Sequence, residues 1–303
     1  TGHRPKEDDF VEQMFVCSTH VPILFFSNFG KVYSVKGYEI PEANKTARGR
    51  AVVNILPLAA GEKVAAMLPV LENGTGYLVM ATKRGIIKKT KTSEFDHILR
   101  SGKIAIRINE DDELISVQFS TGEDDILVAS RSGKCIRFKE ADVRPMGRDT
   151  TGVRAISLSE GDEAVDMIVL REGAEILTVT ENGYGKRSLP EDYRVQTRGG
   201  KGIKAGVFNE KTGRLAGMKL VSDEDDVLLV SSAGIVIRMH AEDILTIGRN
   251  TRGVKLMTLK EGVVATVATT QRDEEEEVTA PEETTASDEA LVEAGEEGEN
   301  DEA

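Results

Sequence analysis

Hydrophobic residues recur along the chain in short runs at a nearly constant interval. A run of apolar residues is followed by a polar turn and a glycine five times, at Gly30, Gly85, Gly133, Gly183 and Gly234. These glycines stand 55, 48, 50 and 51 residues apart. A second short strand-like run, often basic, follows each glycine, so each pair of runs predicts a β-hairpin.

Two further features keep the same interval. A glycine that opens a third short strand recurs at Gly49, Gly102, Gly152, Gly202 and Gly253. An acidic or glycine-containing turn then leads into a fourth apolar strand, which we expect over residues 64–70, 114–119, 164–170, 215–221 and 263–269. Four strands in every repeat of about 50 residues predict one blade of a propeller-like wheel.

The two ends of the chain depart from this pattern. Residues 8–17 match only the acidic turn and the last strand of another repeat. We therefore expect a β domain over residues 1–269, in which residues 1–20 are the remnant of a first blade and five repeats follow. Because the chain opens at Thr1 rather than at a methionine, we expect an N-terminally truncated fragment. Residues 270–303 offer few large apolar groups and predict a disordered acidic tail.

Net charge is unevenly distributed. The whole chain carries −13, from 52 acidic and 39 basic residues. From Asp273 onward there are 15 acidic and no basic residues, so residues 1–272 hold 37 acidic and 39 basic residues and carry +2. The acidic average therefore does not exclude a nucleic-acid partner for the repeats.

Other chemistries find little support in the sequence. Cys17 and Cys135 lie far apart, and the four histidines are scattered, so neither a disulfide framework nor a zinc site is indicated. There is no Walker-type phosphate loop and no apolar run long enough to span a membrane. We expect no cofactor in this chain, no membrane association and a cytoplasmic location. Kelch and WD40 propellers are disfavoured because the chain has no Trp.

Basic residues gather between the hairpin glycine and the third strand of each repeat. Since equivalent positions of a closed repeat lie at equivalent places on the wheel, we expect a belt of cations around one rim, which suits the phosphates of double-stranded DNA. The alternative for any single side chain is solubility and protection of strand edges. The candidate DNA contacts are Arg48, Arg50, Lys88, Lys89, Arg100, Lys103, Arg137, Arg148, Arg154, Lys186, Arg187, Gln196, Arg198, Gly199, Gly200, Lys201, Gly202, Lys204, Arg249, Arg252 and Lys255.

Four segments of the chain resemble those of one protein family. The segments are 32–36 (Val-Tyr-Ser-Val-Lys), 147–154 (Gly-Arg-Asp-Thr-Thr-Gly-Val-Arg), 182–187 (Asn-Gly-Tyr-Gly-Lys-Arg) and 248–255 (Gly-Arg-Asn-Thr-Arg-Gly-Val-Lys). Over residues 1–269 the chain resembles the C-terminal DNA-wrapping domain of the DNA gyrase A subunit. The resemblance implies a six-bladed β-pinwheel whose blades exchange strands, and a basic perimeter that bends DNA. It also implies a role in directing ATP-dependent negative supercoiling by a type II topoisomerase.

The resemblance extends to partners and location. It implies a parent A2B2 heterotetramer with the gyrase B subunit, in which the parent complex uses ATP and Mg²⁺, and a bacterial, nucleoid-associated place in the cytoplasm. The family's nucleophilic Tyr follows an Arg, whereas the five tyrosines here follow Val32, Gly37, Gly76, Gly183 and Asp192. The fragment is therefore expected to be non-catalytic by itself.

The family's seven-residue box, Gln-Arg-Arg-Gly-Gly-Lys-Gly, is expected in the first blade. Here Thr1-Gly2 would be its end, with the rest cut off. Residues 196–202 resemble the box with Thr in its second place, and we interpret them as a secondary DNA-contact loop. The acidic tail is expected either to occupy the basic rim as a DNA mimic or to remain a solvating tail without contacts.

Two other functions remain open from the sequence. The chain also fits the C-terminal domain of the topoisomerase IV A subunit, which relaxes and decatenates DNA, although that domain usually has fewer blades. A propeller that binds protein partners and ignores DNA is an alternative of a different class.

Overall fold

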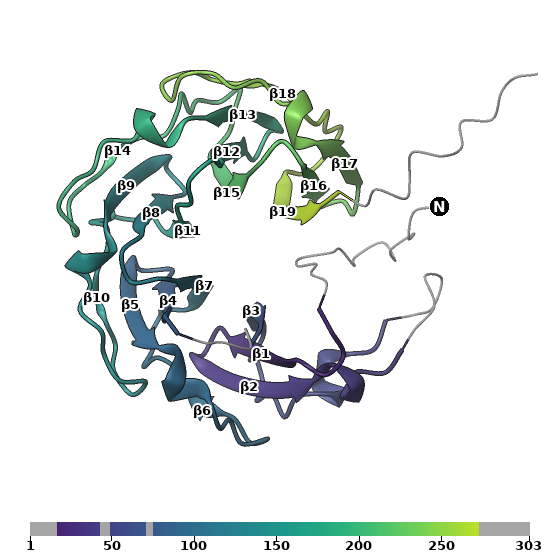
Figure 1. Ribbon diagram of the computed structural model, residues 1–303. Helices are drawn as coiled ribbons and strands as arrows, with labels where there is room; N and C mark the ends of the chain where they lie inside the picture. The colour runs from purple at the N-terminus through teal and green to yellow at the C-terminus, as the bar shows by residue number, and fades with distance from the viewer. Residues whose placement is uncertain (1–16, 43–48, 71–74, 273–303) are drawn as a thin grey trace, which may run out of the picture. The chain divides into compact units, whose positions relative to one another are not determined.

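The computed structural model describes residues 17–42, 49–70 and 75–272, all within one compact unit that extends to Arg272 (Figure 1). The described chain consists of β-strands joined by turns and by short 3-10 helices. No helix in these ranges has the length and apolar character needed to cross a membrane.

A two-stranded antiparallel hairpin begins each repeat, as predicted. The pairs are β1 (Pro22–Ser27) with β2 (Lys31–Lys36), β4 (Tyr77–Thr82) with β5 (Ile86–Lys91), β8 (Asp125–Ser130) with β9 (Lys134–Lys139), β12 (Glu175–Thr180) with β13 (Tyr184–Ser188), and β16 (Asp225–Ser231) with β17 (Val236–His240). All five predicted hairpins are therefore present.

The fourth strand expected in each repeat pairs with the first strand of that repeat's own hairpin. These inner-edge strands are β3 (Val64–Pro69), β7 (Leu114–Ser120), β11 (Ala164–Val169), β15 (Leu215–Val221) and β19 (Val264–Gln271). Together they line one cavity of about 610 Å³. Side chains link neighbouring inner edges: Gln118 of β7 bonds the Met167 carbonyl and the Val169 amide of β11, and Asp166 of β11 accepts from the Met218 amide of β15.

The opposite edge of each of the first four sheets is completed by the following repeat. Two-residue outer-edge strands pair with the second hairpin strand of the preceding repeat: β6 (Lys103–Ile104) with β2, β10 (Val153–Arg154) with β5, β14 (Ile203–Lys204) with β9, and β18 (Val254–Lys255) with β13. The exchange of strands implied by the resemblance is present. Repeat and sheet therefore do not coincide.

The expectation of six blades is wrong, because the described chain forms five sheets. Four of them have four strands, and the last, β17-β16-β19, has three. A sheet requires a hairpin, and the opening stretch offers only a turn and one strand of a repeat. Residues 1–16 of the expected remnant lie outside the described residues, and so does the predicted tail from Asp273 onward.

The third strand expected after Gly49 is also not formed. A 3-10 helix, η2 (Val52–Asn54), follows instead. The four outer-edge strands that do form each pair with the hairpin of the preceding repeat. Because β1 and β2 are the first hairpin in the described chain, the Gly49 segment has no preceding hairpin there to join.

Hydrophobic side chains bury themselves between neighbouring sheets as well as within them. One cluster joins Val79 of β4, Phe138 of β9 and Met167 of β11, and it also holds Ala155, which follows β10. Two neighbouring repeats thus contribute to a single cluster. Burial on both faces explains why so many strand residues are inaccessible, and it bears directly on which basic residues reach the surface.

Candidate nucleic-acid interface

The outer-edge strands place one residue against the sheet and the next toward solvent. In β10, β14 and β18 the first residue is a half-buried Val or Ile and the second is an exposed cation, namely Arg154, Lys204 and Lys255. In β6 this exposed position holds Ile104. Three equivalent exposed cations therefore stand on the outer edges of three consecutive sheets.

A glycine before β10, β14 and β18 allows the close approach of two backbones. Gly202 has φ +68, and a Cβ built there would lie 2.4 Å from the Cys135 carbonyl oxygen. Gly152 has φ +104 and would place a Cβ 2.5 Å from the Ile87 carbonyl oxygen. Any side chain here would push the outer strand off its sheet, so the recurring glycine positions the exposed cation that follows two residues later.

Three six-residue loops of equivalent position, 147–152, 197–202 and 248–253, lead into these strands. The arginine in the second place of each loop bonds the carbonyl of an outer-edge residue in the preceding repeat: Arg148 bonds Ile104 at 3.3 Å, Arg198 bonds Arg154, and Arg249 bonds Lys204. Arg249 also bonds the Asp192 carbonyl at 2.9 Å. These half-buried arginines, which we predicted as DNA contacts, hold successive loops together.

Lys88 and Lys186 do not lie on the exposed rim that the sequence analysis expected, because they are 0% and 2% exposed. The Lys88 ammonium donates to the carbonyls of Ala105 (2.7 Å), Thr150 (3.2 Å) and Arg148. Lys186 donates to the carbonyls of Gly248 (3.2 Å), Thr251 (3.0 Å) and Arg249. Burial lowers the pKa of each lysine to about 8.

The cation that follows Lys88, and the equivalent cation of the next hairpin, are also committed to internal contacts. Lys89 (4% exposed) pairs with the buried Glu140 at 3.4 Å. Arg137 pairs with Asp125 at 2.6 Å and donates to the Pro190 carbonyl at 2.6 Å. The expectation that these residues face the solvent along the rim is therefore wrong.

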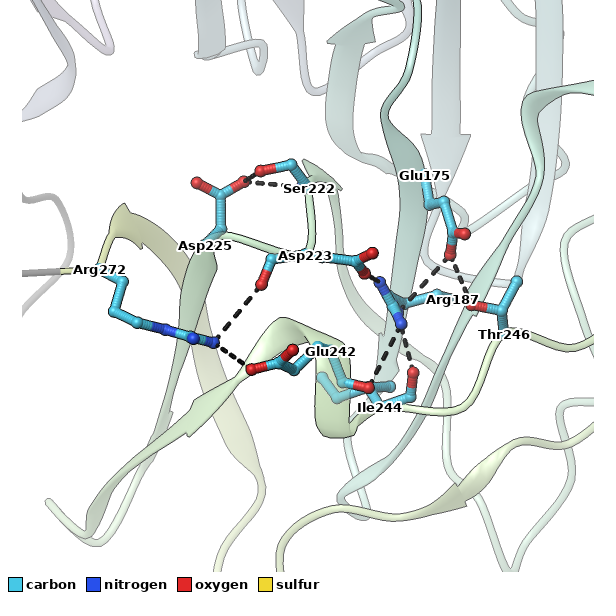
Figure 2. Close-up of polar contacts among 9 residues, drawn as sticks. All are labelled: Glu175, Arg187, Ser222, Asp223, Asp225, Glu242, Ile244, Thr246 and Arg272. Carbon is cyan, nitrogen blue, oxygen red and sulfur yellow. Dashed lines mark hydrogen bonds and ion pairs between the residues drawn. The ribbon is translucent and has the colours of Figure 1, made fainter. Parts of the chain in front are cut away.

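Arg187 shows the same arrangement in Figure 2. Its guanidinium bonds the carbonyls of Ile244 at 2.8 Å and Glu242 at 3.4 Å, and it pairs with Asp223 and with Glu175, 3.6 Å away. Each of these contacts except that to Glu175 reaches beyond the sheet that carries Arg187. Arg187 thus links neighbouring repeats. Its exposed fraction is 7%.

The remaining candidates divide by exposure. Arg50, Arg100, Lys201 and Arg252 are exposed, whereas Lys103, Gln196, Gly199 and Gly202 are half-buried and Gly200 is exposed. Arg252 and Lys255 both lie over the ring of Tyr184, at 5.7 and 4.7 Å from its centroid. Arg48 lies outside the described residues. Among the described residues, no group of three His, Cys, Asp or Glu is arranged to hold a metal ion.

The acidic partners of the buried and half-buried cations were not predicted from the sequence. Asp125, Glu140 and Asp226 are buried and pair with Arg137, Lys89 and Arg238. The hydrogen bonds and charge of Arg137 and Lys139 hold the pKa of Asp125 below its ordinary value against the opposing effect of burial. The sequence did contain one signal that these cations do not all face one surface. Lys88 and Lys89 are adjacent on a strand, so their side chains must point to opposite faces of the sheet.

The family comparison matches this repeat structure. The family model of the DNA gyrase C-terminal domain, described as a beta-propeller, matches five times, over residues 22–71, 76–120, 124–171, 174–222 and 225–270. The chain belongs to the DNA gyrase C-terminal domain family. The five matches equal the five sheets in number, each match holding the hairpin of one sheet, and they agree with the correction of the blade count.

Relatives of this gyrase-family chain include the DNA gyrase A subunits of Staphylococcus aureus strains NCTC 8325 and COL. Each is 44% identical over 290 residues, which are 94% of this chain and 33% of the relative. The chain therefore spans about a third of the length of the curated relatives it matches.

Two solved structures share the fold of this gyrase-family domain. One is a DNA gyrase A C-terminal domain, with a TM-score of 0.72 and 27% identity, covering 84% of this chain and 83% of that one. The other is the C-terminal domain of DNA topoisomerase IV, with a TM-score of 0.75, 22% identity and coverage of 84% and 80%.

Proposed function

We propose that this chain binds double-stranded DNA along the outer edges of its sheets and bends it, as the C-terminal domain of a DNA gyrase A subunit. The observation that carries the proposal is the recurrence of exposed Arg154, Lys204 and Lys255 at one position of three consecutive outer-edge strands. Phosphates of a duplex that passes along these edges would meet a cation at each sheet.

The relatives indicate which enzyme this chain belongs to as a part. Because the chain matches a third of gyrase A proteins, we infer that its DNA contacts direct ATP-dependent negative supercoiling by a gyrase formed with a B subunit in the bacterial cytoplasm. ATP and Mg²⁺ would be used by that parent complex, and we assign no step of their chemistry to this chain. Smooth bending of a segment of 20–30 base pairs by 40–90° costs roughly 1–6 kcal/mol, so several simultaneous phosphate contacts are required.

The topoisomerase IV domain is the second candidate. Its structure supports a common fold, and its 22% identity supports nothing beyond that. The 44% identity with gyrase A relatives favours gyrase.

A salt titration of duplex binding tests the proposal. The logarithm of the affinity should fall linearly with the logarithm of the salt concentration, and the triple variant Arg154→Ala, Lys204→Ala, Lys255→Ala should reduce the slope by about 2.7, or 0.9 for each lost phosphate contact. The matched control is Lys63→Ala, Lys211→Ala, Lys260→Ala, which removes three exposed cations from the turns before the inner-edge strands. Equal slopes for the two variants would contradict binding at the outer edges, and a protein-interaction propeller would bind no duplex at all.

A further inference from the structure

Two of the three equivalent loops share the pattern Gly-Arg-x-Thr-x-Gly and an internal hydrogen bond. The loops 147–152 and 248–253, called here the lysine-backed loops, read Gly-Arg-Asp-Thr-Thr-Gly and Gly-Arg-Asn-Thr-Arg-Gly. In each, the Thr hydroxyl donates back to the first glycine's carbonyl, from Thr150 to Gly147 at 2.9 Å and from Thr251 to Gly248 at 2.8 Å. Behind each loop lies a buried lysine, Lys88 or Lys186.

The lysines fix which way the loop peptides point. Lys88 binds the carbonyls of Arg148 and Thr150, and Lys186 binds those of Gly248, Arg249 and Thr251. The described chain contains no cis peptide bond, and in a trans peptide the N–H of the next residue points opposite to the carbonyl. The amides that follow these carbonyls therefore point away from the ammonium groups.

Four of these outward amides have no acceptor. The residues are Asp149 and Thr151 in one loop and Asn250 and Arg252 in the other, and none of their amides has a hydrogen-bond partner within the described part of the chain. Asp149, Asn250 and Arg252 are exposed, so a ligand can reach them. Free amides of this kind, with an ammonium behind them, offer hydrogen-bond donors and positive potential to an anion.

One outward amide already meets an anionic oxygen. The Arg249 amide, which follows the Gly248 carbonyl held by Lys186, donates to the Asp192 carboxylate at 3.2 Å. The direction assigned to these amides from peptide geometry is therefore one from which an oxygen anion binds.

We propose that each lysine-backed loop binds a phosphodiester group of DNA through its outward backbone amides, and that Lys88 and Lys186 are positioning residues that hold those amides in place. This rests on the proposed function, since it names the phosphate contacts of the same DNA-binding edge. The neighbouring charges agree, because exposed Arg154 follows the first loop, and Arg252 and Lys255 lie in and after the second.

The two lysine-backed loops differ in charge. In the first, Asp149 places a carboxylate beside the amides and pairs with Arg107 through two bonds of 2.7 and 2.8 Å. In the second, Asn250 stands at this position and carries no charge. The side chains within the 248–253 loop therefore repel phosphate less, although the Asp192 carboxylate lies at the Arg249 amide of that loop.

The loop 197–202 is not such a site. Ile136 occupies the place of the lysine, and a Cβ on Gly200 would lie 3.5 Å from its side chain. The Gly199 amide donates to the Ala155 carbonyl at 2.7 Å, which is the equivalent of the Ala105 carbonyl that Lys88 binds. An amide that points outward in the other loops is consumed here in a contact between repeats.

Amide NMR of the 303-residue chain tests the proposal. A duplex of about 20 base pairs and inorganic phosphate are titrated separately into the wild type and into Lys186→Ile, which copies the residue found at Ile136. In the wild type the duplex should shift the amides of Asn250 and Arg252 strongly and those of Asp149 and Thr151 more weakly, while the exposed Glu261 amide stays unchanged.

Lys186→Ile should abolish the shifts at Asn250 and Arg252, leave those at Asp149 and Thr151, and weaken duplex binding at least about tenfold, the value of one lost hydrogen bond to a charged group. Unchanged signals from β8 and β9 show that the variant is folded, and Lys88→Ile provides the reciprocal case in the other loop. Three outcomes would overturn the proposal: duplex binding without shifts at the four amides, shifts at Asn250 and Arg252 that survive Lys186→Ile, or shifts that appear with inorganic phosphate but not with the duplex. Absence of all duplex binding would instead refute the proposed function.

Discussion

The loops 197–202 and 248–253 occupy the same place in adjacent repeats but are held in place by different contacts. In the second, a buried ammonium collects three backbone carbonyls; in the first, Ile136 fills the space and the Gly199 amide supplies the bond to the preceding repeat. The comparison teaches that the direction of the loop peptides, and not the count of cations, separates a phosphate site from a contact between repeats.

Replacement of the lysine should have the largest effect. Lys186→Ile leaves the Arg249 carbonyl without a donor, whereas the carbonyls of Gly248 and Thr251 keep a second one. We expect the free energy of unfolding to fall by about 2 kcal/mol, since an unsatisfied buried polar group costs roughly 1–3 kcal/mol. Urea denaturation measures this change. Ile136→Val is the control in the other loop and should cost about 1 kcal/mol. Equal losses would show that the ammonium does not organise its loop.

Glycine replacement should affect both loops alike. Gly202→Ala and Gly253→Ala each introduce a Cβ at positive φ, 2.4 and 2.5 Å from a carbonyl oxygen of the underlying strand. Each should lower the free energy of unfolding by roughly 1–3 kcal/mol. Gly147→Ala, which has no atom within 4 Å of its built Cβ, should change stability by less than about 0.5 kcal/mol. A large loss in only one of the first two variants would place the difference between the loops at the glycine.

Alkaline pH should weaken only the lysine-backed loops. The pKa of Lys88 and Lys186 is lowered to about 8, and loss of a proton leaves two donors for three carbonyls. The charged groups that face them are Asp149, Arg148 and Glu94 around Lys88, and Arg249 and Asp192 around Lys186. Duplex affinity at constant salt should therefore fall about twofold to fivefold between pH 7 and 9 in the wild type, but not in the variant with both lysines replaced by Ile.

The same pKa shift fixes the sign of the stability change. The unfolded lysines keep the ordinary value of 10.5 and bind more protons than the folded ones between pH 8 and 10.5, so these two groups add to the free energy of unfolding as pH rises through that window. Urea denaturation at several pH values measures the slope. A slope equal to that of the double variant would show that the folded lysines titrate normally.

Removal of one carboxylate should produce the smallest effect. Asp149→Asn gives the first lysine-backed loop the chemistry of the second, so duplex affinity should rise about twofold, the value of a weak exposed charge interaction. Glu110→Gln removes an exposed acid from a turn before an inner-edge strand and serves as the control. A fall in affinity for Asp149→Asn would mean that its pairing with Arg107 matters more than its repulsion of phosphate.

The strands were predictable from sequence because alternation and turn glycines are local signals. The expected strand 215–221 coincides with β15, and the expected strand 114–119 differs from β7 by one residue. The number of complete sheets could not be predicted from local signals, because the outer-edge strand of a sheet comes from the following repeat. Ile203 pairs with Cys135 of the preceding repeat, and a single repeat carries no record of that partner.

The candidate site was predictable only in part. Arg154, Lys204 and Lys255 lie where the pattern placed them, at exposed outer edges. Lys88, Lys89, Lys186 and Arg187 were assigned to the same surface, because basic residues recur at equivalent positions of the repeats. Their burial depends on carbonyls of Thr150 and Thr251 and on the acid Glu140, which reach them from other repeats. A long cation with several acceptors is stable inside a protein, and sequence alone does not show the acceptors.

The linking number of a relaxed DNA circle that is ligated in the presence of this chain tests the central claim, that the outer edges bend DNA, most directly. We predict a shift toward positive values that grows with the ratio of protein to DNA and is lost in the triple variant of Arg154, Lys204 and Lys255. An unchanged linking number under conditions where the chain is bound would contradict the account, because it would mean contact with DNA without bending it around the sheets.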